Sequence, residues 1–515
     1  MSQPEANLVI PGHEKIAEPG MLLMLGIALA VSVELLENQL FVFSANPIQA
    51  GIHASQFEYS MIALAYAVTA ICMIFTQGHW VRLWGYRRFL IGSLILFVAA
   101  GVACTLTTNV WQLGFTRLLQ GVGGGALFTT TRVLLQTQIP AKRRVLAVRI
   151  FLLGVFGPSA LAPFLAGKSI EAFGWQAIFW LPIPLALLAI TFIGLALPRK
   201  HGRVHDVAPS DLPMASIGLV MLGIFGIELA LTEFRFNYFS GFGHIPLLLM
   251  IGVGLAWYFV LHQSKHKQSL LRVHELGNAS YLMGLFFYFW YYFLSNSNAF
   301  VFPLFLEKTL GYSFVTAGLI LTIASLFGLM VLLAYFHYSA RIKSKRPFMI
   351  IALIAMSIYG FSMSVLPADA SFMHISILTM MRSVFTILLA IPLAALVFSE
   401  LDEEIFAHGY QTKNILRQLS ATFAVSVSAV MLENQQIKHV ATMTEHISVS
   451  NPHWAQYKAK MAAVLANIDG LKELTLEQID IYRQALFMAC EDIFRWQGIC
   501  AVVILVILLV QKRLR

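Results

Sequence analysis

The chain has 515 residues, of which 58% are hydrophobic and only 12% are charged. Soluble globular domains are about 45–50% apolar and about 25% charged, so this composition excludes a soluble protein and predicts an all-α integral membrane protein. The 35 Lys and Arg residues outnumber the 26 Asp and Glu residues. They lie in short clusters between apolar segments, which is typical of cytoplasmic loops. The lipid bilayer is therefore an expected partner, and nucleic acid is not.

Fourteen apolar segments follow a polar tail at residues 1–20, which we expect in the cytoplasm. Each segment should form a transmembrane helix, because a helix satisfies its own backbone hydrogen bonds within lipid. The segments lie at residues 21–46, 57–78, 87–107, 110–138, 142–169, 175–197, 212–232, 244–262, 278–306, 313–337, 346–366, 372–398, 409–433 and 484–511.

The basic residues predict how these segments are oriented. Clusters follow six of the seven even-numbered segments, at residues 82–88, 142–144, 199–203, 265–267, 341–346 and 512–515, whereas the loop after the twelfth segment, at residues 400–404, is acidic. The odd-numbered loops carry few Lys or Arg residues, and basic loops stay in the cytoplasm. We therefore expect a multi-pass protein of a bacterial inner membrane, with both termini in the cytoplasm.

The first segment carries two acids, Glu34 and Glu37, within an otherwise apolar stretch. An ionised group at bilayer depth costs about 2.5–3.5 kcal/mol on insertion scales, so each acid needs a reason to be there. At i and i+3 the two acids lie near one face of a helix. Arg117, in the fourth segment, is a buried charge of opposite sign. We expect this group to bind and release protons, with Asn38, Gln39 and Gln120 beside it in a substrate site.

Glycines are concentrated in three stretches of the N-terminal part of the chain. Gly78 and Gly85 flank a basic loop, a glycine run follows Arg117, and a third set lies in the fifth segment. Glycines at these spacings allow close packing of neighbouring helices. The positions of interest are Gly78, Arg82, Gly85, Arg87, Arg88, Gly121, Gly125, Gly154, Gly157, Pro158 and Gly167.

These stretches resemble the signature loop and the antiporter motif of the major facilitator superfamily. With fourteen segments, the chain is similar to the drug:H⁺ antiporter branch typified by EmrB and QacA. Arg82 stands where the signature loop usually has an acid. The resemblance implies two six-helix halves, at residues 21–200 and 276–515, with two inserted helices at residues 201–275.

The branch also has a first-helix acid before an Ala-x-Pro-like end, and Glu37 with Ala45-Asn46-Pro47 is similar to that pattern. The register favours Glu37 as the proton carrier, while Glu34 stays an alternative. The ninth segment would border the central cavity, where aromatic side chains suit flat cationic compounds. For the two arginines that match family positions, helix pairing and a role in transport both stay open. The further residues expected in the substrate site are Phe286, Phe289, Trp290, Tyr292, Asn296, Arg382 and Arg417.

Two regions outside these motifs carry further expectations. Glu228 and Glu233, on the first inserted helix, should lie at a solvated rim. Residues 434–482 should form a long periplasmic loop, with an amphipathic helix at 454–468 and a capping pattern at Thr475 and Gln478 that begins the last helix. This loop is either a surface flap or a docking element for a periplasmic adaptor and outer-membrane channel.

The sequence therefore predicts a proton-coupled efflux transporter that exports small amphipathic or cationic drugs, biocides and dyes by alternating access. The alternative is export of a specific metabolite or a siderophore-like solute. No GxxxxGKS or GxxxxGKT sequence occurs, so the proton gradient rather than ATP should drive export. The four cysteines lack the spacing of a disulfide framework or zinc site, and we expect no metal or other cofactor. The histidines lie in or near loops, which argues against a membrane-embedded enzyme. A non-transporting scaffold is a further alternative.

Overall fold

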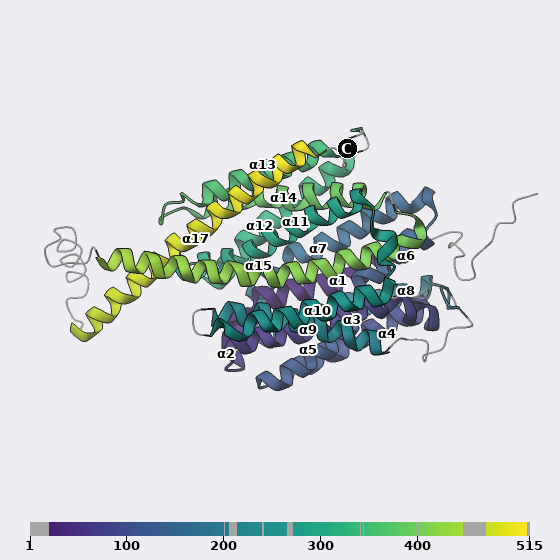
Figure 1. Ribbon diagram of the computed structural model, residues 1–515, viewed down its shortest axis with the longest axis horizontal. Helices are drawn as coiled ribbons and strands as arrows, with labels where there is room; N and C mark the ends of the chain where they lie inside the picture. The colour runs from purple at the N-terminus through teal and green to yellow at the C-terminus, as the bar shows by residue number, and fades with distance from the viewer. Residues whose placement is uncertain are drawn as a thin grey trace, which may run out of the picture.

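The computed structural model describes residues 20–199, 201–204, 214–238, 241–264, 271–339, 341–342, 344–399, 401–445 and 470–511. The regular structure of these residues is helical throughout, and the long helices run side by side in one bundle (Figure 1). The α-helices are α1 (Met21–Phe43), α2 (Ala45–Gly51), α3 (Gln56–Trp84), α4 (Tyr86–Thr105), α5 (Val110–Gly124), α6 (Leu127–Gln138), α7 (Ala141–Phe173), α8 (Ile183–Ala196), α9 (Met214–Asn237), α10 (Ile245–Ser264), α11 (Ala279–Leu304), α12 (Phe314–Tyr338), α13 (Arg346–Met363), α14 (Phe372–Phe398), α15 (Glu403–Glu445) and α17 (Gly470–Val510). Short helical turns lie at η1 (Trp175–Phe179), η3 (Phe242–His244), η4 (Val273–Leu276) and η5 (Phe305–Thr309).

Twelve of the described helices are long and apolar enough to cross a membrane. The other two predicted segments form the broken pair α5–α6 and the aromatic, partly polar α11. Both lie within the bundle, since α5 packs against α3 and α4, and α11 packs against α14 and α15. The all-helical membrane fold is confirmed, whereas the count of fourteen spanning helices stays a prediction.

The helices pack in two groups, with a helix pair beside them. Helices α1 to α8 pack on one another and form the N-terminal group, and α11 to α17 form the C-terminal group. Helix α7 packs along α12 between the groups, and α15 also reaches across to α3 and α6. Helices α9 and α10 pack on each other, and α9 lies against both α3 and α15. The predicted domain boundaries near residues 200 and 276 stay a prediction.

Glycines explain the break between α5 and α6. A Cβ at Gly123 would lie 2.6 Å from the backbone nitrogen of Phe97 in α4, and one at Gly125 would collide with Ala70 in α3. The glycines therefore let three helices touch through their backbones. Helix α5 ends at Gly124 and α6 begins at Leu127. A new helix start leaves its first N–H groups without partners in the helix, and these point into the bundle.

The prediction that residues 434–482 form a loop was wrong at both ends of this range. Helix α15 continues to Glu445, and α17 begins at Gly470, before the capping pattern that was predicted to start it. Both helices project beyond the rest of the bundle (Figure 1). The two helices contact each other before their ends diverge: Gln436 donates to the backbone oxygen of Tyr482 at 3.4 Å, and His439 lies 2.8 Å from Asp492. The predicted amphipathic helix at 454–468 lies outside the described residues.

Candidate functional site

Both acids of α1 are buried inside the bundle, with 0% of Glu34 and 1% of Glu37 exposed. A buried carboxylate needs a charged or hydrogen-bonded partner, because desolvation is otherwise too costly. Although they are three residues apart on one helix, the two acids find partners on different helices. Their partners therefore determine what each acid can do.

Glu37 forms an ion pair with Arg117 of α5. The same guanidinium donates to the side-chain oxygen of Gln120 at 2.7 Å and lies over the ring of Phe41 at 3.9 Å. It also lies 4.4 Å from the ring of Tyr66. Helices α1, α3 and α5 supply all of these groups, so the pair lies within the N-terminal group. The second oxygen of Glu37, Oε2, is buried without a hydrogen bond in the described structure.

Glu34 instead joins the two groups of helices. Its Oε2 accepts a hydrogen bond of 2.8 Å from the backbone N–H of Phe128, in the first turn of α6. This N–H is free because the glycine run has just broken the helix, and a helix start favours a carboxylate. Its Oε1 pairs with Arg417 of α15 at 3.2 Å. Arg417 is the least enclosed member, with 16% of its side chain exposed.

Two uncharged hydrogen bonds accompany this ion pair along α15. Gln411 donates to the backbone oxygen of Ile74 in α3 at 3.0 Å. Asn414 donates to the hydroxyl of Thr129 in α6 at 2.7 Å. Of these three contacts between α15 and the N-terminal group, only Glu34–Arg417 is one that a proton can break.

The sequence analysis missed two cations of this region. Lys413, one turn before Arg417, is buried at 3% exposed, and Arg132 lies half-buried in α6. Each of these two cations lies inside an apolar segment of the sequence, and this position could have identified it as a buried charge.

In the structure, the predicted aromatic residues of α11 fall into two groups. The ring of Tyr292 stacks on that of Tyr288, with centroids 5.8 Å apart, and the ring of Tyr288 lies 5.7 Å from the amine of Lys413. Asn296 donates to the backbone oxygen of Tyr292 at 2.7 Å, within its own helix. A separate aromatic group contains Phe286, Phe289, Trp290, Phe293 and Phe423.

The remaining predicted substrate-site residues are Arg382 of α14, and Asn38 and Gln39, which directly follow Glu37 in α1. Arg382 of α14 is half-buried and interacts electrostatically with Tyr291 and Tyr359. Asn38 is half-buried and Gln39 is exposed. Substrate roles for these three residues stay predictions.

The prediction of a solvated rim was wrong for Glu228, which is 1% exposed. It lies on α9, whose buried face packs against α3 and α15, and this packing removes it from solvent. Glu233 has 18% of its side chain exposed and accepts a hydrogen bond from Asn237.

The predicted signature loop forms the turn between α3 and α4. Gly85 has a φ of +83°, which only glycine adopts without strain, and a Cβ there would lie 3.0 Å from the backbone oxygen of His201. Arg82 donates to the backbone oxygen of Gly78 at 3.4 Å. Arg87 donates to the backbone oxygen of Leu197 at 3.4 Å, and Arg88 is exposed.

The predicted antiporter motif lies in α7, which touches both groups. Pro158 has no N–H to donate to the oxygen of Gly154, and that oxygen accepts from Ser32 of α1 at 2.7 Å. A Cβ at Gly154 would lie 2.5 Å from the backbone oxygen of Ala28. A Cβ at Gly167 would lie 3.1 Å from the Cα of Val315 in α12, whereas one at Gly157 would meet open space. Tight packing along this helix therefore depends on Gly154 and Gly167.

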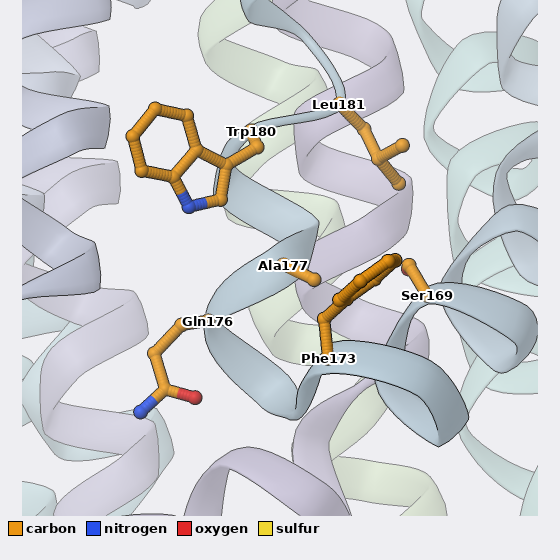
Figure 2. A pocket seen from close by; sticks show the side chains of 6 residues that line it. All are labelled: Ser169, Phe173, Gln176, Ala177, Trp180 and Leu181. Carbon is orange, nitrogen blue, oxygen red and sulfur yellow. The ribbon is translucent and has the colours of Figure 1, made fainter.

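Two hollows lie on the surface of the bundle, away from the buried charges. The first has a volume of about 400 Å³, where α7 meets η1. Figure 2 shows Ser169 and Phe173 together at the end of α7, with Gln176 and Trp180 on the other side of the turn. The second, of about 360 Å³, lies between Arg87, Arg88 and Arg199. Neither touches Glu34 or Glu37.

Ion pairs within an all-helical membrane bundle indicate a functional site, because ionisable groups at membrane depth are rare and costly. The family model of the Major Facilitator Superfamily matches residues 24–425, and the chain belongs to this superfamily.

Two similar proteins come from Escherichia coli K12. Probable multidrug resistance protein EmrY is 22% identical over 485 residues, which cover 94% of this chain and 93% of that protein. Multidrug export protein EmrB is 20% identical over 493 residues, which cover 94% of both. The fold is also similar to the crystal structure of a bacterial homologue of the human lysosomal transporter Spinster. That match has a TM-score of 0.57 and 13% identity, and covers 94% of this chain and 95% of the other.

Proposed function

We propose that this protein is a proton-coupled exporter of small organic compounds in a bacterial inner membrane, with both termini in the cytoplasm. The single observation that carries the proposal is the buried ion pair between Glu34 of α1 and Arg417 of α15. It joins the two groups of helices that alternating access would move against each other. Multidrug resistance and export in the names of EmrY and EmrB support the exporter assignment.

Protonation of Glu34 removes the charge that holds Arg417. The carrier with an unprotonated Glu34 keeps its two groups tied through the ion pair. A proton taken up from the periplasmic side breaks this tie and lets the groups rearrange. Release of that proton into the cytoplasm restores the pair. Substrate is carried in the opposite half of the cycle, so export consumes the proton gradient.

One proton supplies enough free energy for substantial export. A charge crossing ~100 mV releases about 2.3 kcal/mol. At about 1.4 kcal/mol per tenfold, this corresponds to roughly 50-fold accumulation of a neutral substrate. A pH gradient adds to this value.

Glu37 has a different role in this proposal. Its partner Arg117 belongs to the same group of helices, so breaking their pair does not release α15. We assign Glu37 to holding α1 against α5, beside the break that positions the N–H of Phe128. Direct proton transfer at Glu37 is the second candidate, favoured by its buried oxygen that lacks a hydrogen bond in the described structure.

The substrate class and further partners belong to the same proposal. The sequence analysis expected cationic or amphipathic drugs, biocides and dyes, with a metabolite or siderophore-like solute as the alternative. The projecting ends of α15 and α17 offer a site for a periplasmic adaptor and its outer-membrane channel (Figure 1).

The test uses purified protein in liposomes with a pH-sensitive dye in the lumen. Cationic dyes, biocides and siderophore-like acids are added in turn, with and without an uncoupler. At least one compound should drive proton movement in wild-type protein, and Glu34→Gln should abolish it. Proton movement that Glu34→Gln leaves unchanged would reject Glu34 as the coupling residue, and compound flux that ignores the proton gradient would reject proton coupling.

A further inference from the structure

Cations and aromatic rings alternate along the contact between α6, α11 and α15. The guanidinium of Arg132 lies 5.9 Å from the ring of Tyr410, and the amine of Lys413 lies 4.1 Å from the same ring. Lys413 also lies 4.8 Å from the ring of Phe128, and Arg417 lies 5.0 Å from that ring. Arg417 then meets Glu34. We call these five residues, from Arg132 to Arg417, the cation–aromatic row.

The row has an excess of positive charge. Among the described residues, the carboxylate of Glu34 is the acid that forms an ion pair with the row, and it pairs with Arg417. Arg132 donates to the side-chain oxygen of Gln136 at 3.1 Å. The amine of Lys413 lies against the rings of Phe128, Tyr288 and Tyr410, and it interacts electrostatically with Arg132, Arg417 and the Glu34 carboxylate that already pairs with Arg417. Buried cations at membrane depth are normally paired with acids. Two cations beyond the Glu34–Arg417 pair therefore make this region a poor site for another cation.

We propose that the cation–aromatic row binds an organic anion with a flat aromatic body, and that such anions are the substrates of the exporter proposed above. Lys413 and Arg417 lie one helical turn apart on α15, so both can hold the acidic group of one ligand. Arginine offers a planar fork that fits a carboxylate, and lysine adds a compact charge. The stacked rings of Tyr288 and Tyr292, 5.8 Å apart, supply an aromatic wall beside Lys413.

This placement links substrate binding to the proposed proton step. A substrate acid held by Arg417 takes the position that the Glu34 carboxylate occupies in the structure. Substrate and proton then break the same ion pair by different routes: the anion replaces Glu34 as the partner of Arg417, and the proton neutralises Glu34. The two groups of helices then stay joined when the carrier is empty, and they move when either substrate or a proton is bound. Such a carrier exchanges substrate for protons.

A purely structural role is the competing explanation of the row. Cation–π contacts stabilise helix packing by about 0.5–2 kcal/mol each, so the rings and cations would then serve to hold α15 against α6. That role predicts that loss of the Lys413 charge lowers stability without changing which ligands bind. Ligand charge selectivity therefore separates the two explanations.

The experiment measures binding of three probes that differ mainly in charge: 2-naphthoate, neutral 2-naphthamide and the 2-naphthyltrimethylammonium cation. Full-length protein in lipid nanodiscs is titrated with each probe by calorimetry. The variants are Lys413→Met, which removes the charge, and Lys413→Arg, which keeps it. Arg149→Gln is the matched control, because Arg149 is a half-buried cation outside the row that contacts the backbone oxygen of Phe336 at 3.3 Å.

Wild-type protein should bind 2-naphthoate at least tenfold more tightly than either other probe. Lys413→Met should weaken naphthoate binding about 10- to 100-fold, the range for loss of a hydrogen bond to a charged group, and narrow the selectivity. Lys413→Arg should restore most of the affinity, and Arg149→Gln should leave it unchanged. Equal or reversed charge preference, no binding of any probe, or unchanged selectivity in folded Lys413→Met would overturn the inference.

These outcomes are independent of the proposed proton coupling. Naphthoate selectivity without substrate-driven proton movement would reject the coupling and keep the anion site. Proton-coupled export of a cationic dye that Lys413→Met leaves intact would do the reverse.

Discussion

Replacing Glu34 by Gln should release the C-terminal group from the N-terminal group while each group stays folded. Glutamine has nearly the same shape as glutamate and keeps an oxygen that accepts the hydrogen bond from Phe128, now 2.8 Å long. It loses the charge that pairs with Arg417. The substitution therefore imitates a protonated Glu34 that cannot lose its proton.

The size of the effect follows from the burial of the pair. Removing one partner of a buried ion pair costs about 3–5 kcal/mol, because the other charge is left uncompensated. Arg417 keeps 16% of its side chain exposed, which places the cost near the lower limit. About 3 kcal/mol changes the ratio of two conformations roughly 150-fold. Conformations without the pair should gain by this factor in Glu34→Gln.

The assay measures distances between the two groups of helices in lipid nanodiscs. Spin labels at Phe173→Cys and Val365→Cys report on opposite groups, and both positions are strongly exposed, at 81% and 73%. The native cysteines are replaced first. Glu34→Gln should move most of the population to a distance that is rare in wild-type protein. Glu37→Gln should leave the distribution unchanged, since the partner of Glu37 lies in the same group. A wild-type distribution in Glu34→Gln, or a shift in Glu37→Gln alone, would refute the reasoning.

Three further predictions concern packing, backbone geometry and energetics. Gly154→Val should destabilise the protein by about 1–3 kcal/mol, because the new side chain meets the backbone of Ala28. Gly157→Ala is the control, because its side chain faces open space and should leave stability unchanged. Thermal unfolding followed by fluorescence compares the two variants, and equal midpoints would contradict the packing argument. Gly85→Ala should cost about 1–2 kcal/mol, because alanine is strained at a φ of +83°, and an unchanged unfolding midpoint would contradict this. An anion exported against one entering proton moves two charges, so an imposed potential of ~100 mV should raise the limiting accumulation of 2-naphthoate ~2,000-fold, against ~50-fold for a neutral substrate. Radiolabel uptake into inverted liposomes with a potassium diffusion potential checks the ratio.

The sequence was sufficient for the features that depend on local pattern. Apolar segments of bilayer length predict helices wherever they occur, and each predicted segment overlaps an observed helix along most of its length or forms two consecutive helices. Glu34, Glu37 and Arg117 were found because a charge in an apolar segment is rare. The family was recognised because glycine positions record where backbones touch, as Gly125 against Ala70 illustrates.

What the sequence did not contain was the choice of partner. Lys413 and Arg132 carried the same signal as Arg117, but nothing in their local pattern places them against Tyr410. Glu228 lies near the end of an apolar segment, where solvent and a neighbouring helix are equally compatible with the sequence. Its burial depends on how α9 docks against α15, which is a property of the whole bundle.

Our proposal chooses Glu34 over Glu37 by the partner that each acid has, not by register. The position of Glu37 relative to Pro47 favoured it in the sequence, because a register records where along the helix an acid lies. Coupling requires something else: the protonated and unprotonated acids must differ in how they hold the moving parts together. Glu37 meets Arg117 within one group, so a movement of the two groups as rigid bodies would leave its charge with the same partner. Glu34 meets Arg417 across the boundary, and its charge state changes the free energy of one arrangement relative to the other. In the proposed mechanism, a proton on Glu34 therefore shifts the conformational equilibrium, whereas a proton on Glu37 would act within a single group.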